Sequence, residues 1–257
     1  MNASHNPQQA YARLILIALA IGAASLTTGC YEDICPSVDA LPGSPSIGEE
    51  PSILAVGDSI MAMNGQVCQG VAGRAGLALD RYVQDHSVGG RRLDHPDSDD
   101  DIMGQYEAGP WEWVVMTGGG NDMLQECQCN VTGHDEQACL DTIDSLVDLD
   151  AGTGEIYDFL AMVRADETNA ATVLLLGYYD FTESSWASFD GCNPYLPELN
   201  ARYEALAGTE ADFVYVSTAA TMDLTDHPDR IWIDGIHPST EGSQALGWLV
   251  AETISGM

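Results

Sequence analysis

Short runs of consecutive apolar residues alternate along the chain with segments whose apolar residues are spaced three and four apart. The runs predict buried strands at 53–56, 82–88, 113–116, 172–176 and 213–216. The spaced patterns predict helices at 70–80, 139–149, 154–165, 196–207 and 241–253. Uniformly apolar strands separated by helices indicate a parallel sheet that is covered on both faces. We therefore expect an α/β fold, a three-layer α/β/α sandwich with a central parallel sheet of about five strands, and ligands at the carboxyl ends of those strands.

The first fifty residues do not follow this pattern. An apolar run at 14–24 follows Arg13, and small residues lead to Gly29-Cys30, which predicts a signal peptide over 1–29. Glycine before cysteine resembles the lipobox of bacterial lipoproteins, so we expect lipidation at Cys30; the alternative is ordinary secretion with cleavage nearby. Residues 30–51 hold four prolines and predict a tether, and the folded domain is expected over 52–257. The expected location is the cell envelope, with a lipid anchor as the only membrane attachment, or outside the cell in soluble form.

The net charge of the chain limits the classes of partner that it can bind. Aspartate and glutamate total 40, the 8 basic residues are all arginine, and the net charge is −32. Such a surface repels phosphate backbones, which excludes nucleic acid as a partner, and it favours a soluble monomer. The acidic loop at 94–101 offers carboxylates to calcium, but it lacks the EF-hand spacing, and a solvated loop is the simpler interpretation.

Seven cysteines are present. If Cys30 carries a lipid, six remain, an even number that suits three disulfides in an oxidising compartment. A zinc cluster of Cys127, Cys129, His134 and Cys139 is the alternative, although Cys-x-Cys is not the usual zinc spacing. We expect no metal and no other cofactor.

Ester hydrolysis through a covalent intermediate needs an exposed hydroxyl, a base, a group that orients the base, and donors for the oxyanion. Gly57-Asp58-Ser59 follows the first strand directly, so its serine lands at the carboxyl end of the sheet. Asp234 and His237 lie before the last helix, and of the six histidines only His237 has an aspartate three residues earlier. An aspartate at that spacing can hold imidazole Nδ1–H while Nε2 faces the serine.

Two further segments supply candidate oxyanion donors. Gly119-Gly120-Asn121-Asp122 follows the third strand, and the asparagine amide can donate to an oxyanion. Gly90 follows the second strand and can offer an unhindered backbone N–H. Each of these segments taken alone is typical of a turn or a helix cap.

Taken together and in order, the four segments resemble the sequence blocks of the SGNH (GDSL-like) hydrolases over about residues 52–253. That family has a flavodoxin-like fold. The resemblance implies that Ser59 is the nucleophile, that His237 is general base and then general acid, and that Asp234 orients it. It also implies that the oxyanion donors are the N–H groups of Ser59 and Gly90 and the side chain of Asn121. This chain has Asp85 where the family often has an asparagine five residues before its glycine, and the long interval after Asn121 fits a cysteine-containing insertion near 125–150.

The substrate is less well defined by the sequence. Aromatic residues follow the fourth strand and either stack on a sugar, line an acyl pocket or pack among themselves. They are Tyr178, Tyr179, Phe181, Trp186, Phe189 and Tyr195. Arg91 and Arg92 can hold a substrate anion or pair with the acidic surface. We expect an acetyl or short-chain acyl ester of a small molecule or a polysaccharide; the alternatives are a non-catalytic glycan-binding lipoprotein and a cysteine-cluster metalloprotein.

Overall fold

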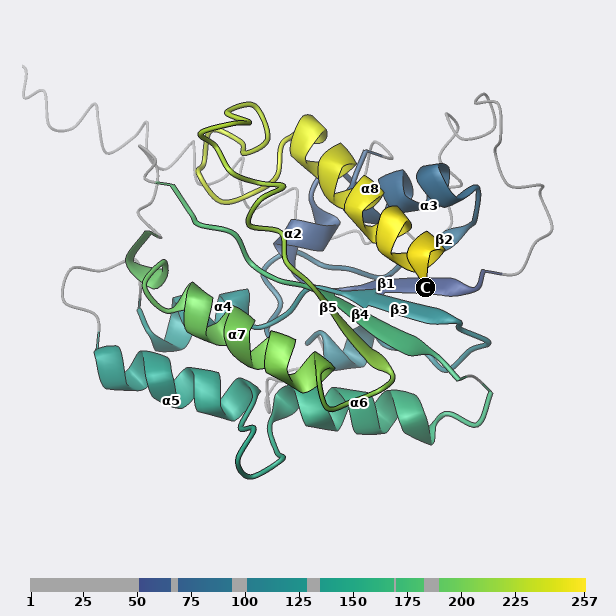
Figure 1. The fold of residues 1–257 in the computed structure, drawn as a ribbon, viewed down its shortest axis with the longest axis horizontal. Helices are drawn as coiled ribbons and strands as arrows, with labels where there is room; N and C mark the ends of the chain where they lie inside the picture. Colours follow the sequence, from purple (N-terminus) through teal and green to yellow (C-terminus); the bar gives the residue numbers. More distant parts are fainter. Residues whose placement is uncertain (1–50, 66–68, 94–100, 129–134, 169, 183–189) are drawn as a thin grey trace, which may run out of the picture.

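A computed structural model describes residues 51–65, 69–93, 101–128, 135–168, 170–182 and 190–257. In this part of the chain, five parallel strands form one sheet in the order β2-β1-β3-β4-β5 (Figure 1). The strands are β1 (Ile53–Val56), β2 (Val83–Asp85), β3 (Trp113–Met116), β4 (Thr172–Leu176) and β5 (Phe213–Val216). The predicted parallel sheet and its flavodoxin-like strand order are confirmed.

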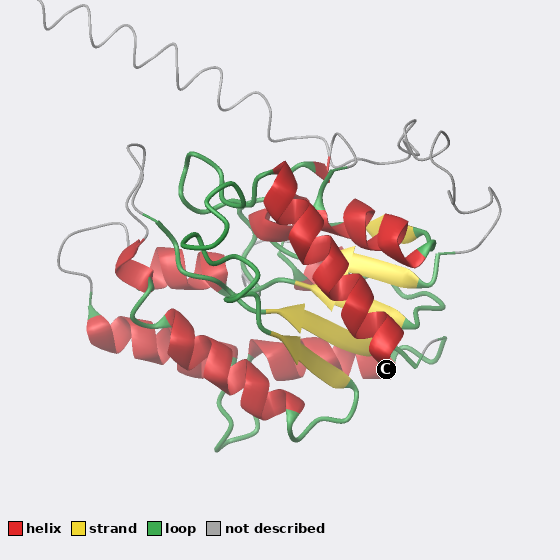
Figure 2. Cartoon of the chain, turned by 45° about the horizontal axis from the view of Figure 1, so that its top comes forward, coloured by secondary structure: helices red, strands yellow, loops and turns green. Residues whose placement is uncertain are grey.

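Helices cover both faces of this sheet, as Figures 1 and 2 show. α3 (Val71–Leu79) and α8 (Thr240–Gly256) pack together on one face. They approach closely at Gly247, where a Cβ atom would come within 2.4 Å of the Arg74 Cβ. The other face carries α4 (Gly120–Glu126), α5 (Glu136–Leu146), α6 (Glu155–Ala165) and α7 (Leu196–Ala207), while the short α2 (Ser59–Ala62) follows β1. The core lies between these layers, and every residue of β1 is buried.

Three elements differ from the prediction. β2 ends at Asp85, although His86 N and Val88 N continue to donate to carbonyls of the β1 segment. α5 begins at Glu136 rather than 139, because the Asp135 side chain caps it by accepting from the N–H groups of Gln137 and Ala138. α4 forms where a glycine turn and a loop were expected, and burial of Met123 stabilises it.

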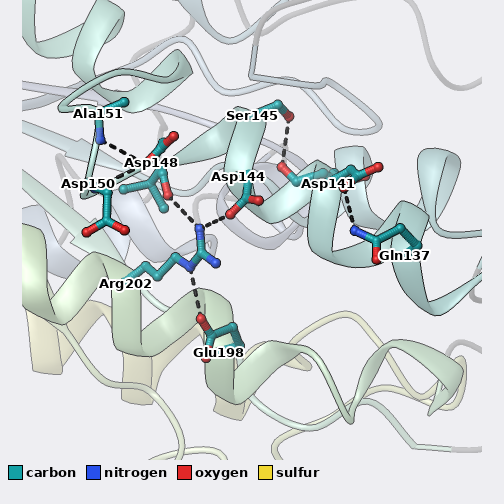
Figure 3. Close-up of polar contacts among 11 residues, drawn as sticks. Gln137, Asp141, Asp144, Ser145, Asp148, Asp150, Ala151, Glu198 and Arg202 are labelled. Atoms are coloured by element: carbon teal, nitrogen blue, oxygen red, sulfur yellow. Dashed lines mark hydrogen bonds and ion pairs between the residues drawn. The ribbon is translucent and has the colours of Figure 1, made fainter.

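Arginines bind together segments of an otherwise acidic molecule. Figure 3 shows Arg202 of α7, which bonds to Glu198 on its own helix at 2.9 Å, to Asp144 of α5, and to the carbonyl of Val147 at 3.1 Å. Arg164 of α6 holds Glu210 and Asp212 in the same way. Among the described residues, no helix is both long enough and apolar enough to cross a bilayer.

The cysteines do not form the three disulfides that were expected. Cys192 is disulfide-bonded, but Cys127 and Cys139 are free thiols, both fully buried, where cysteine packs like a small apolar side chain. The remaining cysteines (30, 35, 68 and 129) lie outside the described residues, as do His134 and residues 94–100 of the acidic loop. The signal peptide, lipidation at Cys30, the tether and calcium binding by the loop stay predictions.

Candidate active site

The strand order brings the first and third sequence blocks to one edge of the sheet. β1 and β3 are neighbours, with Val56 paired to Met116, so the segments that follow them leave the sheet side by side. α3 lies on one face of the sheet and α4 on the other, which makes the carboxyl ends of β1 and β3 a topological switch point. Ser59 and Asn121 therefore lie on the edge where ligands bind in folds of this class.

The turn Gly57–Ser59 carries the candidate nucleophile, Ser59, and is called the nucleophile turn; it is tightly fixed. Gly57 has φ +146°, and a Cβ atom there would lie 2.4 Å from Thr117 Oγ1, so only glycine fits. The Gln105 side chain pairs with both backbone groups of Gly57, accepting from its N–H at 2.6 Å and donating to its carbonyl at 3.0 Å. Ser59 is the first residue of α2 and stays partly exposed.

Asp58, which precedes the candidate nucleophile, is 2% exposed. Its Oδ1 accepts from the Ile60 N–H, capping α2, and from Thr117 Oγ1, both at 2.9 Å. Burial raises the pKa of Asp58 above its ordinary value, while these hydrogen bonds and the charge of His237 oppose that rise. The imidazole therefore lies within electrostatic reach of the nucleophile turn.

Asp234 and His237 form the pair that the sequence predicted. His237 Nδ1 lies 2.6 Å from Asp234 Oδ2, and Asp234 Oδ1 accepts from the N–H groups of Ile236 and His237 at 3.0 Å each. Burial alone would raise the pKa of Asp234, but these hydrogen bonds outweigh it, and the pKa lies below its ordinary value. The aspartate is thus an ionised acceptor that orients the imidazole.

Side chains from other segments hold this pair beside the nucleophile turn. Asn64, which lies just after α2, donates to the Pro238 carbonyl at 3.1 Å and to Ser243 Oγ at 2.9 Å. The Tyr179 hydroxyl donates to the Ile236 carbonyl at 2.6 Å. The last block is therefore held on both sides of His237, by the segment after α2 at Pro238 and by the segment after β4 at Ile236.

The oxyanion candidates lie on two adjacent segments. Asn121 Nδ2 donates to the Arg91 carbonyl at 2.9 Å, which orients the amide and leaves its second hydrogen for another acceptor. A Cβ atom on Gly89 would lie 3.6 Å from the Ser59 Cβ, and Gly90 beside it has φ +80° and open space around it. Asp85 shapes this loop, because its Oδ1 accepts from the Ser87 N–H at 3.0 Å and from the Ser87 hydroxyl at 2.5 Å.

Arg92 serves the protein rather than a substrate. It bonds to the buried Asp122 at 3.0 Å and to Glu126 at 2.8 Å, while Asp122 also accepts from the Leu93 N–H at 3.1 Å. Burial raises the pKa of Asp122, and the contacts with Arg92 counter that rise. Of the two roles considered for Arg92, pairing with acidic side chains is confirmed, and the pairing fixes the segment that follows Gly90.

Three of the aromatic residues after β4 pack inside the protein. Tyr178, Tyr179 and Phe181 are buried, and Phe181 makes edge-to-face contacts with both tyrosines. Of the alternatives weighed from the sequence, packing of the aromatic rings among themselves is therefore the correct one for these three residues. Tyr195 is partly buried, and Trp186 and Phe189 lie outside the described residues.

Several side chains that support the site had not been singled out from the sequence. They are Asn64, Gln105, Thr117 and Tyr203, the last of which donates to the Gly118 carbonyl at 3.1 Å. None belongs to a short motif. The described residues contain no group of three or more His, Cys, Asp or Glu side chains that could hold a metal ion.

Comparisons with solved structures agree with this fold. Among solved structures of the same fold, an extracellular lipase from Streptomyces rimosus has 18% sequence identity and a TM-score of 0.50, and the match covers 80% of this chain and 99% of that one. A member of the lipolytic G-D-S-L family from Veillonella parvula has 14% identity and a TM-score of 0.54, over 80% and 98% of the two chains. A carbohydrate esterase, whose active site is described as having divergent catalytic and non-catalytic binding functions, has 13% identity and a TM-score of 0.51, over 81% and 70%.

No curated protein matches the sequence. A sequence profile of the GDSL-like lipase/acylhydrolase family matches residues 55–245, a span that includes Ser59, Gly90, Asn121, Asp234 and His237. The match covers well over half of the chain and every block from which the site is built. The chain belongs to the GDSL-like lipase/acylhydrolase family.

Proposed function

We propose that this protein is a serine esterase that hydrolyses carboxylic esters through an acyl-enzyme on Ser59. The observation that carries the proposal is the Asp234–His237 hydrogen bond of 2.6 Å, held by Asn64 and Tyr179 beside the turn that bears Ser59. An oriented imidazole next to a partly exposed serine is the arrangement that activates a hydroxyl nucleophile.

In the proposed reaction, Ser59 Oγ attacks the ester carbonyl carbon and its proton passes to His237 Nε2. Asp234 keeps the Nδ1–H in place and stabilises the imidazolium that forms. His237 then gives the proton to the leaving alcohol oxygen as the carbon–oxygen bond breaks. Water attacks the acyl-enzyme by the same route, with His237 again taking a proton, and this step releases the acid and restores Ser59.

Charge on the carbonyl oxygen develops among three segments of the site, those that follow β1, β2 and β3. We propose the N–H groups of Ser59 and Gly90 and the free amide hydrogen of Asn121 as its donors. The position of Gly89 against Ser59 and the hydrogen bond from Asn121 to the Arg91 carbonyl support this assignment, because they keep the loop of 89–91 between the nucleophile and the amide.

For the substrate we propose an acetyl or short-chain acyl ester of a small molecule or a polysaccharide. The lipase and the carbohydrate esterase of similar fold support esters as the substrate class. The net charge of −32 favours a neutral substrate over a polyanion, because the protein's field repels anions.

We also propose that the protein is exported and anchored through a lipid on Cys30. The apolar run at 14–24 and the glycine before Cys30 support this, and a disulfide at Cys192 fits an oxidising compartment. Mass spectrometry of the mature amino terminus tests it. An acylated Cys30 is expected, and an unmodified terminus elsewhere would overturn the anchor.

Labelling with a fluorophosphonate, followed by a panel of p-nitrophenyl esters, tests the catalytic proposal. The wild-type protein should be labelled at Ser59, and Ser59→Ala should lose both labelling and hydrolysis. Ser145→Ala, which removes an exposed hydroxyl on α5, is the control and should keep both. A Ser59→Ala variant with full activity would overturn the assignment. A wild-type protein that is not labelled but still binds glycan would favour the alternative, a non-catalytic glycan-binding lipoprotein. The carbohydrate esterase of similar fold is described as having both catalytic and non-catalytic binding functions.

A further inference from the structure

One buried hydroxyl contacts both halves of the candidate site. Tyr178, which follows β4 and is 3% exposed, donates to Asp58 Oδ2 at 2.5 Å. The Tyr178 hydroxyl oxygen also accepts from the Gly120 N–H at 2.8 Å. Asp58 directly precedes Ser59, and Gly120 directly precedes Asn121. A single oxygen therefore lies between the residue before the nucleophile and the residue before the oxyanion amide.

The donor and acceptor roles in the hydrogen bonds around Asp58 follow from which groups keep their protons. Burial first, and the neighbouring Asp58 charge second, raise the pKa of Tyr178 well above its ordinary value, so the hydroxyl keeps its proton and donates it. Asp58 also accepts from Ile60 N–H and from Thr117 Oγ1, and Thr117 Oγ1 accepts in turn from the Asp58 N–H at 3.2 Å. Every contact of the carboxylate is with a donor, as a charge-assisted network requires.

Tyr178 is itself held firmly. Asn200 of α7 pairs with its backbone, accepting from the Tyr178 N–H at 3.0 Å and donating to its carbonyl at 2.7 Å. On the other side, the ring packs directly against Gly120, where a Cβ atom would come within 2.6 Å of Tyr178 Cε1. The hydroxyl consequently has one available position, and both of its partners are placed relative to it.

We propose that Tyr178 is a positioning residue that sets the place of Ser59 relative to Asn121. The inference rests on the proposed esterase function, in which the two side chains must act on the same carbonyl group. A misplacement of about 1 Å between reacting groups can cost a factor of about 10² in rate. Loss of the bridging oxygen would release the Asp58 turn from the start of α4 while leaving every group that touches the substrate intact.

Tyr178→Phe removes only that oxygen. We expect kcat on p-nitrophenyl acetate to fall by about 10- to 100-fold. KM should stay within about twofold, because the lost interaction serves the transition state rather than substrate binding. The rate of fluorophosphonate labelling should fall in parallel.

Tyr106→Phe is the matched control. It removes another tyrosine–aspartate hydrogen bond, from Tyr106 to Asp166 Oδ2 at 2.8 Å, which joins the segments that lead into the amino ends of β3 and β4. Its kcat should stay within about twofold of wild type. Circular dichroism and thermal unfolding of both variants separate a change in rate from a loss of fold.

Several outcomes would overturn the inference. A folded Tyr178→Phe variant with wild-type kcat would do so, as would a loss that Tyr106→Phe shares or a rise in KM alone. If Tyr178→Phe does not fold, Asp58→Asn removes the charge that the hydroxyl binds, and an unchanged kcat in that variant also overturns the inference. A wild-type protein that is neither labelled by the fluorophosphonate nor able to hydrolyse esters would overturn the proposed function itself. An active wild type with an equally active Tyr178→Phe variant would overturn only the positioning role of Tyr178.

Discussion

Replacing Asp234 by asparagine tests the orienting role of the aspartate without removing its volume. Asp234 Oδ1 accepts from two backbone N–H groups at 3.0 Å, and Oδ2 faces His237 Nδ1 at 2.6 Å. Asparagine can keep its oxygen toward the two backbone donors or turn it toward the ring. Turning it would set the amide NH₂ against two N–H groups, and each buried donor left unsatisfied costs about 1–3 kcal/mol. The oxygen therefore stays with the backbone, and the NH₂ faces the imidazole.

That orientation forces the wrong tautomer on His237. An NH₂ group only donates, so Nδ1 must accept and the ring proton moves to Nε2. In the proposed mechanism Nε2 takes the Ser59 proton, and a protonated Nε2 can no longer do so. We expect kcat to fall by about 10⁴, equivalent to about 5.4 kcal/mol in the activation barrier. The fold should persist, because both backbone hydrogen bonds remain.

Initial rates with p-nitrophenyl acetate, together with thermal unfolding, measure this effect. Asp223→Asn is the matched control, since Asp223 is exposed, accepts from the Thr225 N–H at 2.7 Å, and lies four residues before His227. That variant should keep wild-type kcat within about twofold. If folded Asp234→Asn kept more than about a tenth of wild-type kcat, the reasoning from the tautomer would be refuted.

The other predictions concern the oxyanion donor, the nucleophile turn and acid stability. Asn121→Ala should lower kcat by about 10²–10³ with little change in KM, as for one lost oxyanion donor, and a loss below about tenfold in steady-state assays would contradict that role. Gly57→Ala should lower the free energy of unfolding in urea by at least about 2 kcal/mol, because its Cβ would meet Thr117 Oγ1. Gly152→Ala is the control, since Gly152 also has a positive φ but lies in open space, and its loss should be smaller. Equal losses in the two variants would argue against the contact with Thr117. The fold lowers the pKa of Asp234 below the ordinary 3.8, so its charge stabilises the protein above that pH, and the contribution is lost as the pH falls through the folded value. The difference in unfolding free energy between wild type and Asp234→Asn should thus shrink below about pH 4, and a difference that grew toward acid would contradict the sign.

The sheet could be predicted from sequence because its strands are buried on both faces. β1, β3, β4 and β5 are predominantly apolar runs, and all four match the predicted limits. β2 is partly exposed along its length, and its limits were correspondingly missed. Strand patterning is thus informative where burial on both faces leaves no choice of residue type.

α4 shows where local reasoning fails. It begins with Gly120, Asn121 and Asp122, residues of low helix propensity, and spans only 7 residues, too few for a stable isolated helix. Its stability comes from contacts outside the helix: Met123 is buried, and Asp122 receives hydrogen bonds from Arg92 and the Leu93 N–H. No sequence pattern within residues 120–126 indicates those contacts, so a turn was predicted there.

The same distinction separates the candidate catalytic residues from the residues that hold them. Ser59, Asn121 and the Asp234–His237 pair could be proposed because their segments, each typical of a turn when taken alone, occur together and in order after buried strands or before the last helix. Tyr178 could not, because a tyrosine after a buried strand has equally good structural and binding roles, and its partner Asp58 is 120 residues away along the chain. What decides between those roles is whether the hydroxyl finds an acceptor inside the protein. Once it does, the ring is removed from the substrate's reach, and its proposed influence on the reaction passes through Asp58, which precedes Ser59, and Gly120, which precedes Asn121.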